Sequence, residues 1–120
     1  MDIEILVYDN QLGYYDLLRE ELRTGYVFTL YPSYTDDSPA KHDAVIFFLN
    51  DGIELIDLAK LYDEKLPFIL ASTKITGDGL LKRENLFTVN LNLTKDELVK
   101  ELKIILDGIT NQLILSEKAL

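Results

Sequence analysis

Apolar residues gather in short blocks along the chain, and polar or turn-forming residues separate the blocks. The blocks have the length of β-strands, and the first, third and fourth of them are largely apolar, as strands are in a parallel sheet that is covered on both faces. The pattern therefore predicts five strands, over residues 3–8, 26–31, 44–49, 68–73 and 86–91.

Between several of these strands, apolar residues recur at intervals of three and four, as they do on one face of a helix. The spacing predicts one helix over residues 11–25, with Asn10 as its N-cap, and a second over residues 53–66. Thr94-Lys95-Asp96-Glu97 has the spacing of a capping box and predicts the start of a long last helix. The predicted core-facing positions of that helix are Leu98, Leu102, Ile105 and Ile109.

Two segments that connect the predicted elements are expected to contain little regular structure. Residues 32–41 contain two prolines and a cluster of Ser, Thr and Asp, which favour turns. Residues 74–85 contain two glycines, each of which costs a helix about 1 kcal/mol relative to alanine. We expect irregular chain or short helices in both segments, so the second and fourth helices of the fold are predicted to be weak.

Strands that alternate with helices predict an α/β protein with one domain over residues 1–120. The expected architecture is a doubly wound, five-stranded parallel sheet between two layers of helices, a three-layer sandwich. Ligands and chemistry in such folds gather outside the carboxyl ends of the strands. The residues predicted at that edge are Asp9, Asn10, residues 48–51, Ser72, Thr73 and residues 90–92.

Charge and composition narrow the class of partner. The chain has 21 acidic and 12 basic residues, a net charge of −9, which disfavours phosphate backbones and anionic membrane surfaces. It has no cysteine, which excludes disulfides, thiolate metal sites and cysteine nucleophiles. With no signal peptide pattern and no apolar run of about 20 residues, we expect a cytoplasmic protein that binds neither nucleic acid nor membranes.

The order and spacing of the predicted elements resemble the receiver domain of bacterial response regulators, whose fold is flavodoxin-like. EILVYDN resembles the first receiver strand with its terminal acidic pair, and DAVIFF resembles the third strand. PFILAST resembles the fourth strand, and LFTVNLNLTKDEL resembles the fifth strand and last helix. The resemblance covers nearly the whole chain and implies a function in two-component signalling.

The same resemblance implies that the phosphorylation site is incomplete. Receivers hold Mg²⁺ with carboxylates, accept phosphate on an aspartate, and bind the phosphoryl group with a hydroxyl and a lysine. Here Phe48 stands at the acceptor position, Asn10 replaces one acid, and Asn90 replaces the lysine. Asp9 and Ser72 alone remain. The implied protein is a pseudo-receiver, which is not an enzyme and has no metal or cofactor.

Three alternatives stay open at this point. Asp51 accepts phosphate if the third strand extends further, although Asp before a glycine and a helix is also a good N-cap. Asp9, Asn50 and Asp51 together offer oxygens to a cation. A small flavodoxin-like enzyme or ligand-binding protein would use the same strand ends, but no matched acid–base pair or phosphate-binding loop is visible there.

The last helix is longer than one sheet requires, and Gly108 within it marks a possible bend or end. Apolar residues continue past that point and need cover. The resemblance implies a partner-binding face on this side of the molecule, because receivers commonly bind partners there. The predicted surface for a protein partner or a second copy comprises Leu80, Leu81, Leu113 and Leu115, and the alternatives are a tail that folds back and a frayed end.

Overall fold

The structure, a computed structural model, describes residues 3–10, 13–22, 24–31, 42–62, 65–73 and 85–118, with the backbone alone at 116–118. All five predicted strands form, each ending within one residue of its expected position. The strands, the helices and one 3₁₀ turn (η1) follow one another along the chain in this order: β1 (Ile3–Tyr8), α1 (Gly13–Glu21), β2 (Tyr26–Tyr31), β3 (Ala44–Leu49), η1 (Gly52–Glu54), α2 (Leu55–Leu61), β4 (Phe68–Ser72), β5 (Leu86–Asn90) and α3 (Lys95–Lys118).

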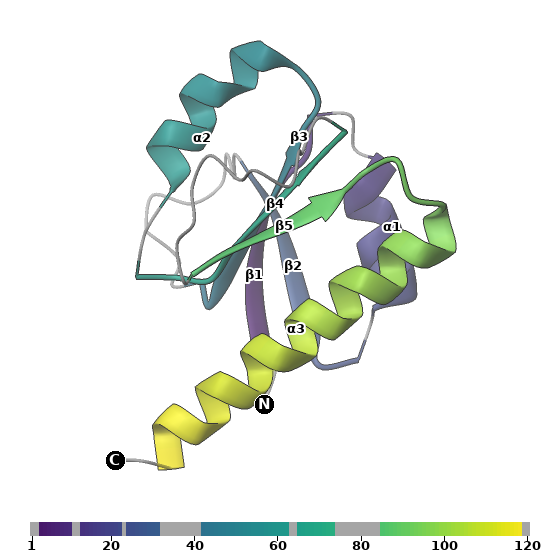
Figure 1. Ribbon diagram of the computed structural model, residues 1–120. Coiled ribbons are helices and arrows are strands. Elements are labelled where there is room, and N and C mark those ends of the chain that lie inside the picture. The colour runs from purple at the N-terminus through teal and green to yellow at the C-terminus, as the bar shows by residue number, and fades with distance from the viewer. Residues whose placement is uncertain are drawn as a thin grey trace.

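The strands form a single parallel sheet in the order β2-β1-β3-β4-β5 (Figure 1). In the centre of the sheet, β3 pairs with β1 and with β4, so that Ile46 lies between Val7 and Ile69. Side chains alternate between the two faces of β3, and both faces are buried. The predicted fold class, a doubly wound α/β sheet, is confirmed.

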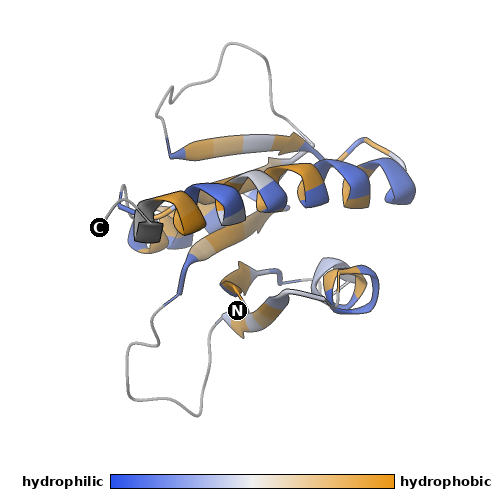
Figure 2. Ribbon diagram, turned by 90° about the horizontal axis from the view of Figure 1, so that it is seen from below, coloured by the Kyte–Doolittle hydropathy of each residue, from blue (hydrophilic) through white to orange (hydrophobic). Residues whose placement is uncertain are grey.

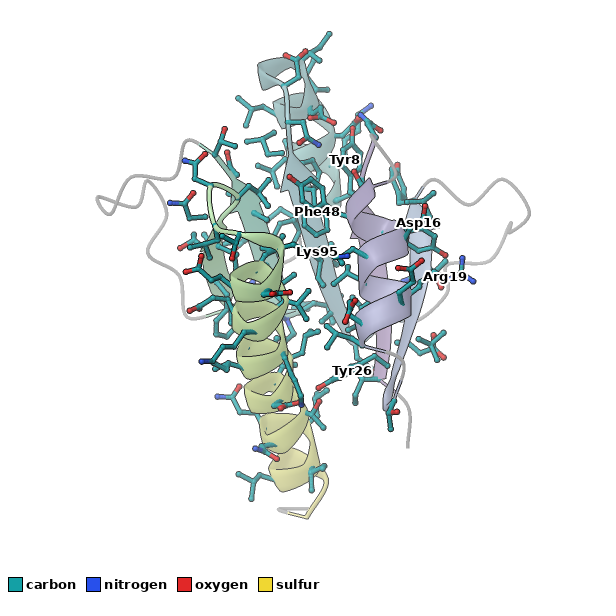
Figure 3. All side chains as sticks on the ribbon, turned by 90° about the vertical axis from the view of Figure 1, so that its right-hand side faces the viewer. Tyr8, Asp16, Arg19, Tyr26, Phe48 and Lys95 are labelled. Atoms are coloured by element: carbon teal, nitrogen blue, oxygen red, sulfur yellow. The ribbon has the colours of Figure 1, made fainter. Side chains whose placement is uncertain are left out.

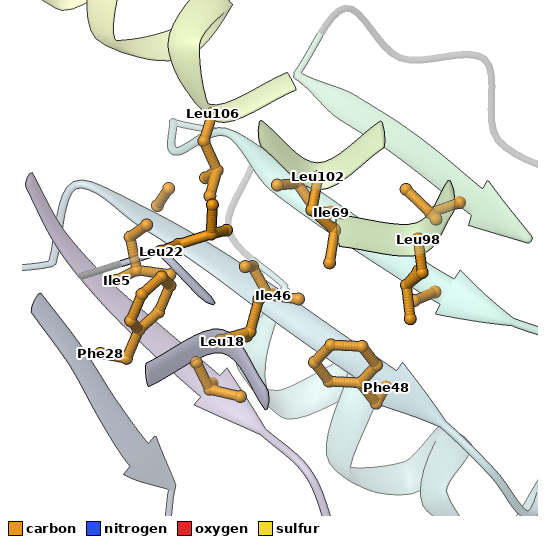
Figure 4. Packing of buried hydrophobic residues seen from close by; sticks show 14 of the residues in the cluster. Ile5, Leu18, Leu22, Phe28, Ile46, Phe48, Ile69, Leu98, Leu102 and Leu106 are labelled. Atoms are coloured by element: carbon orange, nitrogen blue, oxygen red, sulfur yellow. The ribbon is translucent and has the colours of Figure 1, made fainter. Parts of the chain in front are cut away.

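One face of the sheet packs against α1 and α3. Figure 4 shows Leu18 of α1, Leu22 directly after this helix, and the leucines of α3 packed against Ile46 and Ile69. On the opposite face, Phe47 and Phe68 pack against Leu58 of α2. Figure 2 shows that the strands are mostly hydrophobic and that α3 alternates between hydrophobic and hydrophilic residues. An amphipathic helix of this kind packs its hydrophobic side against the sheet.

The start of α3 is as predicted, and its core face includes Leu106 in addition to the predicted positions, of which Ile105 packs at the edge of the core. Glu97 N donates to Thr94 Oγ1 at 3.2 Å, and Thr94 N donates to Glu97 Oε1 at the same distance. Leu106 is fully buried, whereas Ile105 is only half-buried. The helical period explains the difference, because position 106 lies directly between 102 and 109 on the face that the core covers. The helix continues through Gly108 without ending there.

The other two helices differ from their predicted bounds. The first, α1, ends at Glu21, before the predicted end at residue 25, and the side chain that accepts from the amides of Tyr14 and Tyr15 is Asp9, whereas Asn10 was predicted as the cap. The second, α2, is shorter than predicted and ends at Leu61. It ends because Tyr62 takes an extended conformation (φ −63°, ψ 125°), in which its ring packs against Phe68 with centroids 5.3 Å apart.

The weak second and fourth helices expected within residues 32–41 and 74–85 fall, apart from Asn85, outside the described residues. The same applies to Leu80 and Leu81. Among the helices that the structure does describe, none is both long and apolar enough to cross a membrane.

Candidate functional site

Asp9 follows β1 at the carboxyl edge of the sheet, where the phosphorylation site of a receiver was expected. Its side chain is buried, and Oδ2 accepts hydrogen bonds from the amides of Tyr14 and Tyr15 at 2.9 Å each. A carboxylate is favourable there because the first amides of a helix lack partners within the helix and carry partial positive charge. The receiver resemblance implies two acids at the end of this strand, and Asp9 is the one that is present. One of its carboxylate oxygens therefore caps α1.

Phe48, at the position implied for the phosphate acceptor, is completely buried. Its ring stacks on the ring of Tyr14, with centroids 4.6 Å apart and planes 4° from parallel. Figure 3 shows Phe48 between α1 and α3, near Tyr8 at the end of β1. The side chain belongs to the main core cluster, so this strand end is packed with aromatic carbon.

Glu54, in η1, places a second buried carboxylate beside these strand ends. Its Oε1 accepts from the amides of Asn50 and Asp51 at 2.7 Å each. Its Oε2 accepts from Asn10 Nδ2 at 2.5 Å. Hydrogen bonds to an ionised carboxylate are stronger than neutral ones. Glu54 therefore ties the end of β1 to the connection that follows β3.

Tyr8 extends this network toward α2. Its hydroxyl donates to Asp57 Oδ2 at 2.6 Å and accepts from Asn10 Nδ2 at 3.0 Å. Its ring stacks on Phe47 with centroids 4.1 Å apart. Burial raises the pKa of the Tyr8 hydroxyl to about 12, and the hydrogen bond to Asp57 acts in the same direction.

The remaining predicted residues have local structural contacts. Asp51 is exposed and caps η1, with Oδ1 accepting from Ile53 N at 3.3 Å. Ser72 is buried at the end of β4, in register with Asn90 of β5. Asn90 is exposed, and its Oδ1 accepts from Asn92 N at 2.8 Å in the turn before α3.

In the described part of the chain, no three Asp, Glu or His side chains lie close enough together to hold a metal ion. A cleft of about 510 Å³ lies between α1 and the start of α3, with Asp16 on one helix and Lys95 on the other (Figure 3). None of the residues predicted for the receiver pocket lines it; its lining is Gly13, Tyr14, Asp16, Leu17, Glu20, Leu91, Leu93, Lys95 and Leu98.

Sequence reasoning did not identify Glu54, Tyr8, Asp57 or Tyr14 as part of this region. Glu54 carries a recognisable pattern, because Asp51 and Glu54 have the D-x-x-E spacing of a capping box, as Thr94 and Glu97 have T-x-x-E. The stacking of Tyr14 on Phe48 joins residues distant in sequence, and no local pattern predicts it.

Neither a protein-family model nor a curated protein matches the sequence. Among solved structures, the chain is similar to the BeF3-activated DrrB receiver domain, with a TM-score of 0.58 and 16% sequence identity. The similarity covers 89% of this chain and 99% of that domain. At this identity the likeness shows the fold, and the protein therefore has a receiver-like, flavodoxin-like α/β fold.

Proposed function

We propose that this protein is a pseudo-receiver: a receiver-like signalling protein that acts through protein–protein contacts and does not use phosphorylation. The observation that carries the proposal is the complete burial of Phe48 and its stacking on Tyr14. These two rings fill the strand end where the receiver resemblance implies an acceptor carboxylate.

The chemistry of phosphoryl transfer supports this proposal. The reaction needs a nucleophilic oxygen, a divalent cation and positive charge around the transferred group. Phe48 offers no oxygen, and one Asp9 oxygen already binds two helix amides. Asn90 carries no charge and binds the backbone of its own turn. The groups around this edge are therefore suited to holding the fold together.

Glu54 gives a physical reason why the protein would stay in one state. In an active receiver, the bound metal and phosphoryl group favour one conformation over another. Here a carboxylate of the chain itself binds the Asn50 and Asp51 amides and the Asn10 side chain. Since this internal ligand is always present, regulation would come from a protein partner and not from a metal or phosphate.

The alternative acceptor, Asp51, is less consistent with its surroundings. Its carboxylate caps η1, and its backbone amide bonds to Glu54. Phosphorylation of Asp51 would add negative charge beside Glu54, the other carboxylate of this capping box. We therefore favour the structural role for Asp51.

Treatment with acetyl phosphate and Mg²⁺ followed by intact mass measurement tests the proposal. We expect the mass to remain unchanged, while a phosphorylatable receiver domain treated in parallel gains a phosphoryl group. A Mg²⁺-dependent mass increase would overturn the proposal. If that increase disappeared in an Asp51→Asn variant, the atypical active receiver would replace it.

A further inference from the structure

Helix α3 has a second row of positions on the side that faces away from the core. The intervals along this row are four, three, four, three and four, the spacing of the seam along which two helices pack in a coiled coil. All six residues are exposed, Ile104 by 59% and Leu115 by 64%. The row consists of Glu97, Glu101, Ile104, Gly108, Asn111 and Leu115.

Glu97, at the start of the row, belongs to the capping box with Thr94, but the packing of α3 within its own chain does not account for the exposed apolar residues Ile104 and Leu115. The opposite side of the helix is buried through Leu98, Leu102, Leu106 and Ile109. Gly108 destabilises a helix relative to alanine, yet a Cβ built there meets nothing within 4 Å. A glycine with open space around it, between two exposed apolar side chains, allows a second helix to approach closely.

We propose that the occupant of this row is α3 of a second copy of the chain, packed antiparallel. This inference rests on the proposed function, because it names the chain itself as one protein partner. In the antiparallel register Ile104 faces Leu115 of the partner subunit, and Gly108 faces Asn111 of the partner subunit. The end of α3 extends beyond the sheet, which leaves it accessible to a second helix (Figure 1).

The charges of the row select the antiparallel arrangement. A parallel pair would place Glu97 and Glu101 against the same acids of the second copy, which is unfavourable. In the antiparallel pair the acidic end of one helix lies beside the carboxyl end of the other. The same spacing continues there to position 118, which is a lysine in the sequence.

The acid beside the centre of the row does not oppose this pairing. Asp107 accepts a hydrogen bond from Tyr26 Oη at 2.6 Å and forms an ion pair with Lys103 Nζ at 2.9 Å. Its carboxylate is therefore partnered within its own chain.

Sedimentation velocity over a range of concentrations tests the dimer, in about 0.15 M salt to screen the net charge. We expect the wild type to dimerise. Ile104→Glu and Leu115→Glu should each weaken the dimer by more than about tenfold. Each substitution occurs once in each subunit, so it places two charges in the interface of a symmetric dimer. The matched control is Ile56→Glu, since Ile56 is 62% exposed on α2. It should dimerise as the wild type does. A melt of each variant at low concentration checks folding.

A wild type that stays monomeric, or seam variants that dimerise like the control, would overturn the inference. Both results would leave the mass measurement with acetyl phosphate unchanged, because that measurement reports on the strand ends alone. Conversely, a chain that becomes phosphorylated and still dimerises through α3 would contradict the proposed function and support the seam.

Cysteine cross-linking tests the orientation, since the native chain has no cysteine. We expect a disulfide when the Ile104→Cys and Leu115→Cys proteins are mixed and oxidised. Neither protein alone should cross-link, because an 11-residue offset separates identical positions by about 16 Å along the seam, and disulfides need Cα atoms within about 7 Å. Disulfides within each single variant would indicate a parallel pair and overturn the proposed arrangement.

Discussion

Two regions of the molecule differ in how far their side chains are buried: the carboxyl ends of β1 and β3, and the outer row of α3. At the strand ends, Asp9 and Glu54 are buried and bonded within the chain, and Phe48 has no exposed surface. On the outer row of α3, Ile104 and Leu115 lie more than half exposed. In a receiver-like fold the strand ends are the expected place for chemistry, whereas here their side chains stabilise the fold, and the outer row of α3 is the surface that we propose for a partner.

The two regions should therefore respond differently to the same substitution. A change at the strand ends removes contacts that hold the monomer together. A change on the outer row of α3 removes surface that only a second molecule would cover. Stability measured at low concentration separates these effects, because association contributes little there.

Removal of the Phe48 ring should produce the largest effect. Phe→Ala substitutions in cores cost about 3–5 kcal/mol, through lost burial and the cavity that remains. We expect Phe48→Ala to lower the free energy of unfolding in urea by that amount or to prevent folding. Ile104→Ala, a truncation at an exposed position, should change it by less than about 0.5 kcal/mol. Equal costs at the two positions would contradict the contrast.

Removal of the Glu54 carboxylate should have an intermediate effect. Glu54→Ala removes the acceptor of the Asn50 and Asp51 amides, and a hydrogen bond to a charged group contributes about 1.5–3 kcal/mol to stability. Glu54→Gln keeps one acceptor oxygen and should lose less. The control is Glu101→Ala on α3, where the side chain is exposed and the expected change is within about 0.5 kcal/mol. A Glu54→Ala variant as stable as this control would show that the network contributes little.

The ionisation of Tyr8 should leave stability at neutral pH unchanged and should have its effect at high pH. Its folded pKa of about 12 lies above the ordinary tyrosine pKa of 10.0, so between these two pH values the folded state keeps the proton while the unfolded state loses it. The stabilisation is fully present below pH 10.0 and is lost as the pH rises toward about 12. Tyr8→Phe should show a shallower loss of stability across this window in urea titrations. An unchanged pH profile would argue against the raised pKa of Tyr8.

The sequence alone predicts the fold better than it predicts the contacts at the strand ends. Blocks of apolar residues mark the strands because strands buried on both faces need continuous apolar runs. The capping box at Thr94 marks the start of α3 because its pattern is local. The helix that was expected to begin at residue 53 begins instead with η1, because Asp51 and Glu54 close a tight turn that helical periodicity does not distinguish from a longer helix.

Long-range pairings account for what sequence reasoning missed. Phe48 was placed at the acceptor position by resemblance, but its stacking partner Tyr14 comes from a different element. Glu54 reaches Asn10 across 44 residues of chain. The predictions for residues 32–41 and 74–84, including Leu80 and Leu81, stay predictions. Of the predicted contact residues on α3, Leu113 packs against the core, whereas Leu115 is exposed.

The melting temperature with and without Mg²⁺ and beryllofluoride tests the central claim most directly, because it reports any occupancy of the strand ends. A ligand that binds only the folded state adds about 2.7 kcal/mol of stability at 100 times its Kd. We predict no shift for this protein, while the DrrB receiver domain, whose BeF3-activated form is a structural neighbour, should be stabilised. A clear rise in melting temperature that requires both Mg²⁺ and beryllofluoride would contradict the account.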